Sequence, residues 1–329
     1  MKKVFNRILA IDGSYLLNRA LKVPEIFELR GPNGQRSGGV FQFMSSLVHE
    51  LKVNGDYFPV VCWDSNLSPR RVKLDSNYKH ADERSKEKPV LTETESDMDY
   101  VTQYRKQRAM VIELLDYAGV PSLIYRDYEG DDLLYILSNI SDYCCVVTDD
   151  KDMLQLLSPT TVVRRPRFKE TCVLSEFLER ENLDNIYEFV MRKAILGDPS
   201  DNIPSCAKGV GKASVHSLIE VLKFCDFDRS YFSSESTLKD FCSKYNLPYK
   251  KAFTNFDFDR YQINIGLVDL NLVEVDEYVV ESIVSSIYNC RSTVDYFGFV
   301  SNLNHMGIEK ISADEVIEAV SGKRVYLER

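Results

Sequence analysis

The sequence has little of what marks secreted, membrane-spanning or zinc-binding proteins. It has four histidines, and its eight cysteines form no Cys-x-x-Cys pair and lie at no zinc-ligand spacing with a histidine. No apolar run approaches the ~20 residues that a membrane-spanning helix needs. The first apolar segment is short and ends at Asp12, so we expect no signal peptide. These absences predict a cytoplasmic protein with reduced thiols that is not bound to a membrane.

The composition is that of a globular protein with a core. The chain has 329 residues, of which 44% are apolar and 28% are charged, and this length favours two domains. The formal net charge of −9 disfavours binding to nucleic acid through bulk charge. Such binding is still expected if the carboxylates gather at one site and the basic residues gather elsewhere.

Short β-branched runs alternate with helical segments in the first half of the chain. We predict strands over residues 7–11, 59–63, 121–125, 144–148 and 160–163, and helices over 39–51 and 100–118. This alternation is typical of an α/β fold with a mostly parallel sheet and helices on both faces. The lone tryptophan, Trp63, is assigned to core packing.

Acidic residues follow directly after four of the five predicted strands. They are Asp12, Asp64, the group Asp127, Glu129, Asp131 and Asp132, and the group Asp149, Asp150 and Asp152. Ligands of open parallel sheets bind outside the carboxyl ends of the strands, so we expect these side chains to gather there. One aspartate after a strand is ordinary turn chemistry, but four such sites favour a common role.

Gathered carboxylates repel one another and need cations to stay ionised. Oxygen-only ligand sets suit Mg²⁺ or Mn²⁺ rather than zinc, and many carboxylates suggest two ions. Because two-metal sites are built for in-line phosphoryl displacement, hydrolysis of a phosphodiester is the expected chemistry.

The strand pattern ends near Leu174, and the second half of the chain is predicted to be helical. A helix over residues 186–196 ends at Gly197, and the polar loop that follows carries Asp198 and Asp201. A second helix, which runs to about residue 222, opens with Lys208, Gly209, Val210, Gly211 and Lys212.

This hairpin is predicted to hold a phosphate backbone without reading bases. Glycines at a helix start present backbone N–H groups to an anion, and the two flanking lysines add charge. A plain helix connection is the alternative. A Walker A loop does not fit, because its first glycine would fall at Cys206 and its Ser/Thr at Ala213.

Three motifs, in this order and spacing, resemble the flap endonuclease/5′-3′ exonuclease family. They are Tyr128-Glu129-Gly130-Asp131-Asp132, Thr148-Asp149-Asp150-Lys151-Asp152, and Gly197-Asp198-Pro199-Ser200-Asp201-Asn202-Ile203-Pro204 followed by Gly209-Val210-Gly211-Lys212. The family includes the ribonucleases H of T-even phages and the 5′-nuclease domain of bacterial DNA polymerase I. The resemblance covers about residues 7–222. Beyond them, residues 261–270 resemble the T-even phage type, which favours a phage protein.

The resemblance implies a structure-specific 5′-nuclease built from two domains. A PIN-like α/β catalytic domain over residues 1–184 would carry a helical arch over about 70–110. A helical DNA-binding domain over 185–329 would contain a helix–three-turn–helix over about 186–222. The implied ligands of two Mg²⁺ ions, for which Mn²⁺ can substitute, are Asp12, Asp64, Glu129, Asp131, Asp132, Asp150, Asp152, Asp198 and Asp201.

The base of the implied arch carries basic residues. Tyr78 and Lys79 resemble the family's Tyr-Lys pair, in which the lysine contacts the scissile phosphate and the tyrosine stacks near the terminal base. Arg70 or Arg71 would be the preceding basic residue. Asp82 stands where the family usually has an arginine, and Arg84 is the substitute candidate. Residues 70–88 carry seven basic and four acidic side chains, and a second basic cluster at 164–169 is a candidate duplex contact.

The resemblance also implies ligands and partners. The substrates would be DNA with 5′ flaps, nicks or RNA primers, and K⁺ would bind at the helix–three-turn–helix. A single-stranded-DNA-binding protein or a replication clamp is an implied partner, and we expect a monomer in the host cytoplasm if the gene is phage-encoded. Three alternatives stay open: a PIN-type ribonuclease, a catalytically inactive structure-specific DNA-binding protein, and an unrelated magnesium-dependent phosphatase.

Overall fold

The computed structural model describes residues 1–79, 95–206, 215, 219–221, 223, 233–246, 256–290 and 293–328. The chain packs into two compact units. Unit 1 comprises Met1–Asn66, Val90–Val173 and Glu274–Arg329, and unit 2 comprises Leu67–Pro89 and Leu174–Val273.

Unit 1 is built around one sheet. Its elements are β1 (Phe5–Asp12), α1 (Gly13–Leu21), α2 (Pro24–Phe27), α3 (Gly38–Val53), β2 (Phe58–Cys62), α6 (Glu95–Tyr117), β3 (Ser122–Leu123), α7 (Gly130–Ile140), β4 (Ser141–Val147), η1 (Lys151–Leu156), β5 (Thr161–Arg165), β6 (Glu170–Cys172), α13 (Glu277–Asn289), α14 (Tyr296–Met306), α15 (Ala313–Val320) and η5 (Lys323–Tyr326).

The six strands lie in the order β3-β2-β1-β4-β5-β6. All pairings are parallel except β5 with β6, which form an antiparallel edge. The predicted mostly parallel sheet is therefore confirmed, while the sequence pattern did not predict β6. Only three residues long, β6 is too short to give a periodic signal.

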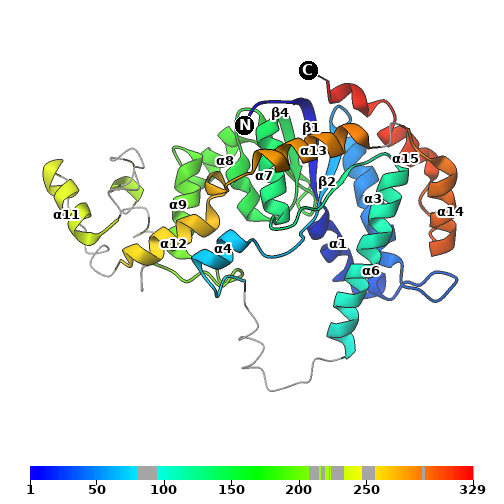
Figure 1. Ribbon diagram of the computed structural model, residues 1–329, viewed down its shortest axis with the longest axis horizontal. Helices are drawn as coiled ribbons and strands as arrows, with labels where there is room; N and C mark the ends of the chain where they lie inside the picture. Colours follow the sequence, from blue (N-terminus) through cyan, green and yellow to red (C-terminus); the bar gives the residue numbers. More distant parts are fainter. Residues whose placement is uncertain are drawn as a thin grey trace. The chain divides into compact units, whose positions relative to one another are not determined.

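Helices cover both faces of the sheet, as predicted. Leu9 and Ile11 of β1 point into a core shared with α1, α3, α6, α14 and α15, and the fully buried Trp63 lies in the same core. Along a strand the side chains alternate, so Ile8 and Ala10 face the other side, where α7 packs on β1 and β4. Figure 1 shows α1, α3 and α6 on one side of the strands and α7 on the other.

The strand β3 is shorter than predicted. It covers only Ser122–Leu123 instead of residues 121–125. The chain leaves the sheet there and turns through Asp127, whose φ of 71° is left-handed, to place Glu129 at the start of α7. Because the chain leaves the sheet early, Glu129 lies at the start of α7.

Unit 2 is helical in its described residues. Its elements are α4 (Pro69–Leu74), α8 (Leu174–Glu181), α9 (Ile186–Leu196), α11 (Glu235–Lys244), α12 (Phe258–Val268) and η4 (Leu270–Leu272). The predicted helix over 186–196 is confirmed as α9, which ends at Gly197 with a φ of 74°. The buried Tyr261 of α12 and Ile195 of α9 share one apolar cluster, with α4 packing on α12.

The two compact units are not separated by a single boundary near residue 185. The C-terminal helices α13, α14 and α15 belong to unit 1, and the buried apolar residues of α14 and α15 lie in the same core as those of α3 and α6. The arch base, residues 67–79, belongs to unit 2. The division by function at residues 184 and 185 stays a prediction. Among the described helices, none is both long and apolar enough for a membrane crossing.

Removing one partner of a buried ion pair should strongly destabilise unit 1. Arg164 of β5 donates to Glu50 of α3 at 3.1 Å, and the two side chains are 8% and 2% exposed. Glu50→Ala would leave the guanidinium buried without its partner, so it should lower the free energy of unfolding by about 3 kcal/mol. Urea denaturation measures this loss.

The matched control lies on the same helix. Lys52 pairs with Glu315 at 2.9 Å, but both side chains are about half exposed. Lys52→Ala should therefore change stability by less than about 1 kcal/mol. Equal losses for the two variants would mean that burial does not govern the Glu50 pair.

Candidate metal centre

The register of the sheet gathers acidic residues at the carboxyl ends of its central strands. Asp12 ends β1 beside Cys62 of β2, and Ile11 pairs with Val147 of β4, so the residues after β2 and β4 lie next to Asp12. These following segments carry Asp64 and Asp150. The negative charges of both act on Asp12, which places the three predicted ligands within electrostatic range of one another.

Asp12 is buried, and this burial changes its chemistry. Desolvation raises the pKa of Asp12 to about 7, and the charges of Asp64 and Asp150 add to the rise. Hydrogen bonds from the Tyr15 amide (2.8 Å) and the Thr148 hydroxyl (2.9 Å) favour the ionised form without outweighing desolvation. A cation beside Asp12 would relieve this unfavourable charge.

Two hydroxyl side chains hold the carboxylate segments in place. Thr148 donates to Asp12, and its oxygen accepts from the Asp150 amide at 3.1 Å, which ties the ends of β1 and β4 together. The Ser14 hydroxyl accepts from the Asp64 amide at 2.9 Å. Sequence reasoning assigned no role to Ser14 or Thr148. The available signal was their place in the sequence: Thr148 lies between β4 and two aspartates, and Ser14 follows two residues after Asp12.

The start of α7 brings in the second acidic group. Glu129 and Asp132 form a capping box, in which each side chain accepts from the backbone amide of the other, and both residues are buried. Asp64 accepts from the Gly130 amide at 2.7 Å, so β2 and the start of α7 are joined. A Cβ at Gly130 would lie 3.1 Å from the Asp64 carboxylate, a tight approach that glycine avoids. Asp131 is half-buried on the same first turn.

Residues 149–152 have separate roles. Asp150 caps η1 by accepting from the Asp152 amide at 2.8 Å. The Asp149 carboxylate accepts instead from the Tyr15 hydroxyl and from the Arg167 amide at 3.2 Å. Asp149 thus anchors the β5–β6 turn to α1.

Unit 2 holds the last two predicted ligands on the loop after α9. Carboxylate oxygens of Asp198 and Asp201 lie within 4.8 Å of one another. Although burial raises the pKa of Asp198, Lys193 at 2.8 Å and the Ser200 hydrogen bonds outweigh it and bring the value to about 2. Asp198 is therefore ionised at neutral pH.

The arch base packs into unit 2. Tyr78 is 3% exposed and lies in the apolar cluster, which leaves little of its ring for stacking on a base. Arg71 is 2% exposed and donates to the Leu267 carbonyl at 3.3 Å, and Arg70 donates to the Gly266 carbonyl at 2.7 Å. These arginines bind the last carbonyls of α12, a contact that stabilises a helix C-terminus. Their predicted contacts with DNA stay predictions.

Some predicted site residues lie outside the described residues. They are Arg84 and the hairpin Lys208, Gly209, Val210, Gly211 and Lys212.

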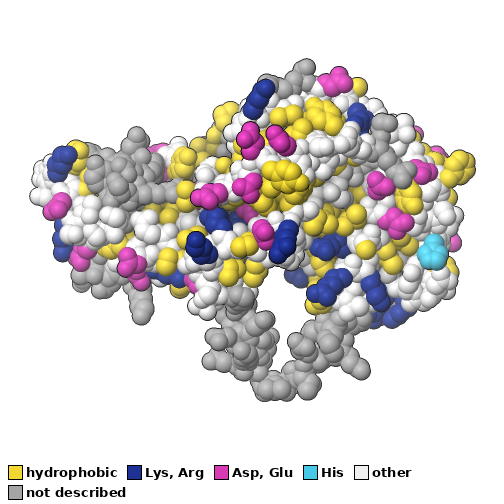
Figure 2. Space-filling model, in the orientation of Figure 1, with side chains coloured by type: hydrophobic (Ala, Val, Ile, Leu, Met, Phe, Trp, Pro, Cys, Tyr) yellow, Lys and Arg dark blue, Asp and Glu magenta, His cyan; other side chains and the backbone are white. Residues whose placement is uncertain are grey.

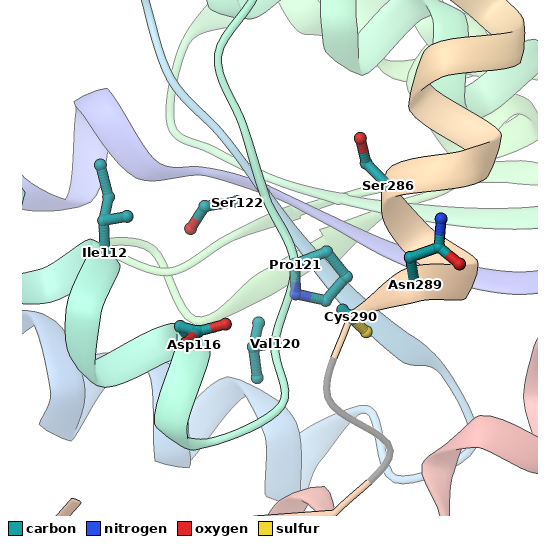
Figure 3. A pocket seen from close by; sticks show the side chains of 8 residues that line it. All are labelled: Ile112, Asp116, Val120, Pro121, Ser122, Ser286, Asn289 and Cys290. Carbon is teal, nitrogen blue, oxygen red and sulfur yellow. The ribbon is translucent and has the colours of Figure 1, made fainter. Parts of the chain in front are cut away.

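The described surface does not separate charges by sign on the face that Figure 2 shows, where acidic and basic side chains are interspersed. Figure 3 shows a pocket of about 400 Å³ in unit 1, between α6, the start of β3 and α13. Among the described residues that line it, Asp116 is the one carboxylate, and the pocket adjoins the amino end of β3. The pocket therefore differs in chemistry from the acidic group at the carboxyl ends of the strands.

The buried Asp12 should make the stability of the metal-free protein depend on pH. Its folded-state pKa of about 7 exceeds the ordinary value of 3.8, so the folded protein keeps a proton that the unfolded chain releases between these values. The contribution of Asp12 to the free energy of unfolding should therefore fall as the pH rises through this window. Asp12→Asn keeps a capping side chain and removes the charge, so it should stabilise the protein by about 1 to 3 kcal/mol at pH 8.

Urea denaturation in EDTA from pH 4 to pH 8 tests this dependence. The advantage of Asp12→Asn should grow between pH 4 and pH 7 and then level off. Asp240→Asn, on the exposed face of α11, is the control and should show no such growth. An advantage of constant size across this range would contradict the titration of Asp12.

Comparisons with known proteins agree with this geometry. Residues 7–185 match the model of the 5′-3′ exonuclease N-terminal, resolvase-like domain. DNA polymerase I of Lactococcus lactis subsp. cremoris is 26% identical over 290 residues, which cover 82% of this chain and 30% of that protein. Thermostable DNA polymerase I of Thermus thermophilus is 28% identical over 220 residues, which cover 65% of this chain and 24% of that protein. The chain thus spans less than a third of the length of these relatives.

A solved structure shares the fold over most of the chain. The T5 5′-exonuclease with bound divalent metal ions (zinc) superposes with a TM-score of 0.64 and 20% identity, over 87% of this chain and 99% of that one. At this identity the likeness shows the fold alone. The family model, however, matches more than half of the residues, and the chain therefore belongs to the 5′-3′ exonuclease family.

Proposed function

We propose that this member of the 5′-3′ exonuclease family is a structure-specific nuclease that cuts phosphodiesters near the 5′ ends of DNA flaps, nicks and RNA primers. The observation that carries the proposal is the acidic group of unit 1, where the buried Asp12 meets the charges of Asp64 and Asp150. Such a group is costly without cations, and its oxygen-only donors suit Mg²⁺ or Mn²⁺.

Two Mg²⁺ ions are the proposed cofactors, held by the nine carboxylates named from the sequence. Asp12, Asp64, Asp150 and the residues at the start of α7 would supply the ligands of unit 1, and the loop after α9 those of unit 2. When bound, the ions supply a water of lowered pKa and a counter-charge for the phosphate. Lys79 would stabilise the charge that develops on the reacting phosphate.

The residues around the ligands keep them in place before a metal binds. Thr148 and Ser14 fix the ends of the strands, and the capping box fixes Glu129 and Asp132. Positioning of this kind lowers the reorganisation that catalysis requires.

We further propose that residues 208–212 hold the DNA backbone, with K⁺ at the same helix–three-turn–helix. A T5 flap endonuclease structure contains both DNA and metal ions, which supports DNA as the substrate class. A single-stranded-DNA-binding protein or a replication clamp is the proposed partner of a monomer that acts in the host cytoplasm.

Product sizing on 5′-labelled substrates tests the function. With Mg²⁺ or Mn²⁺, the protein should release short 5′ products from a flap, a nicked duplex and an RNA–DNA hybrid, because bound metal activates the attacking water. EDTA should abolish cleavage, and added zinc should not be required. Release from the 3′ end, or hydrolysis of a free nucleotide ester at an equal rate, would overturn the proposal.

Binding and chemistry should fail separately. Asp150→Asn removes a ligand charge, so it should abolish cleavage while DNA affinity in Ca²⁺ stays near the wild-type value or tightens. Lys212→Ala removes a phosphate contact, so it should weaken binding about equally across DNA sequences. It should also lower the salt slope, the magnitude of the slope of log binding constant against log salt concentration, by about one.

The matched control for Lys212 is Lys239→Ala. Lys239 is an exposed lysine of α11 that pairs with Glu235 of the same helix. Binding isotherms at several salt concentrations and single-turnover rates compare the three variants. A wild-type salt slope for Lys212→Ala would mean that residues 208–212 are a plain helix connection. Loss of DNA binding by Asp150→Asn would mean that the carboxylates and residues 208–212 do not have separate roles in chemistry and binding.

A further inference from the structure

Two segments of unit 2 that are distant in the sequence are joined by hydrogen bonds. We call residues 75–79 the lysine turn and residues 198–204 the aspartate loop. The Lys79 amide donates to the Asp201 carbonyl at 3.0 Å. The Asn202 side chain donates to the Asn77 carbonyl at 2.8 Å. The backbone of Lys79 is thus fixed to the peptide of a proposed metal ligand.

Both sides of this junction have an uncommon backbone conformation. Lys79 has a φ of 53° and Asn202 a φ of 57°. Residues other than glycine rarely adopt these angles, although asparagine does so more readily than lysine. The surrounding contacts must hold Lys79 in this conformation, and its bond to Asp201 is one of them.

A second connection runs through α12. Asn264 is fully buried, and its amide nitrogen donates to the Ala194 and Pro204 carbonyls, both at 2.8 Å. Its oxygen accepts from Arg260 at 2.7 Å, and the Arg260 guanidinium pairs with Asp75 of the lysine turn at 2.5 Å. The chain of contacts therefore leads from the end of the aspartate loop, through one helix, back to the start of the lysine turn.

The two connections close a ring. The lysine turn contacts the aspartate loop directly at one end and through Arg260 and Asn264 at the other. Asn264 in this ring is buried, whereas the Asn202–Asn77 bond is exposed, and a closed network of hydrogen bonds favours one arrangement of its members. The turn and the loop are consequently expected to move together.

We infer that Asn202, Asn264 and Arg260 are positioning residues that hold Lys79 in register with Asp198 and Asp201. The inference rests on the proposed function, in which these aspartates bind metal and Lys79 acts on the reacting phosphate. Because the lysine turn and the aspartate loop are bonded to each other, an ion that fixes the loop also fixes the turn. Metal binding at the aspartate loop should then change the hydrogen exchange rate of the Lys79 amide.

Asn202→Gly is the sharpest test of the direct connection. Glycine accepts a φ of 57° without strain, so the variant removes the side-chain bond to Asn77 and leaves the backbone free to keep its shape. The matched control is Asn182→Gly, since Asn182 is an exposed asparagine of the same unit with a φ of 51°. Arg260→Gln tests the connection through α12, and Arg260→Lys should recover part of the loss.

Amide hydrogen exchange of Lys79, with and without Mg²⁺ and in the absence of DNA, is the main readout. Mg²⁺ should slow this exchange in the wild-type protein and in Asn182→Gly. In Asn202→Gly and Arg260→Gln, the factor by which Mg²⁺ slows the exchange should be about 3- to 10-fold smaller. Asp201→Asn should remove the effect of Mg²⁺. On a 5′ flap, the two ring variants should lose about 3- to 10-fold in single-turnover rate with unchanged DNA affinity, which a general loss of folding would not produce.

The outcomes separate this inference from the proposed function. If the wild-type protein cuts no flap while Mg²⁺ still slows exchange at Lys79 through Asn202, the proposed function fails and the positioning ring stands. If flaps are cut but Asn202→Gly behaves like Asn182→Gly in both measurements, the ring is overturned and the function stands. The absence of any Mg²⁺ effect at Lys79 in the wild-type protein overturns the inference in either case.

Discussion

The burial of Asp12 beside other carboxylates is the constraint on which the candidate metal centre of unit 1 depends. A carboxylate at the end of a central strand loses its hydration, and here its pKa rises to about 7. The fold keeps this unfavourable group by surrounding it with donors from the strand ends and from α1. The same arrangement that makes the ionised form costly without metal makes the site receptive to a cation.

Unit 2 handles its acidic residues in a different way. Asp198 pairs with Lys193 and accepts from Ser200, so its pKa falls to about 2. The aspartate loop is further tied to the lysine turn and to α12. One unit thus offers a buried carboxylate that a proton can occupy, and the other offers an ionised carboxylate on a braced loop. A proton would therefore compete with a cation at Asp12, whereas Asp198 is already ionised at neutral pH.

Packing also explains why several basic residues near the arch base are not exposed. The side chains of Arg70 and Arg71 donate hydrogen bonds to carbonyls at the C-terminal end of α12. Asp75 forms an ion pair with Arg260. A run of positive charge in the sequence predicts a binding surface, but Arg70 and Arg71 of this run are used inside unit 2. The residues that anchor the lysine turn differ from the residue that would contact the phosphate.

The sequence by itself determined the alternation of strands and helices, the order of the acidic motifs and the end of α9 at Gly197. These features depend on local periodicity and on backbone preferences, which neighbouring residues encode. Only the tertiary structure decided that Thr148 and Ser14 hold the carboxylate segments, that Asn264 joins α9 to the aspartate loop, and that α13 to α15 return to unit 1. Those contacts join residues up to hundreds of positions apart, and their partners are chosen by packing and by the need to satisfy buried polar groups, which no local pattern records.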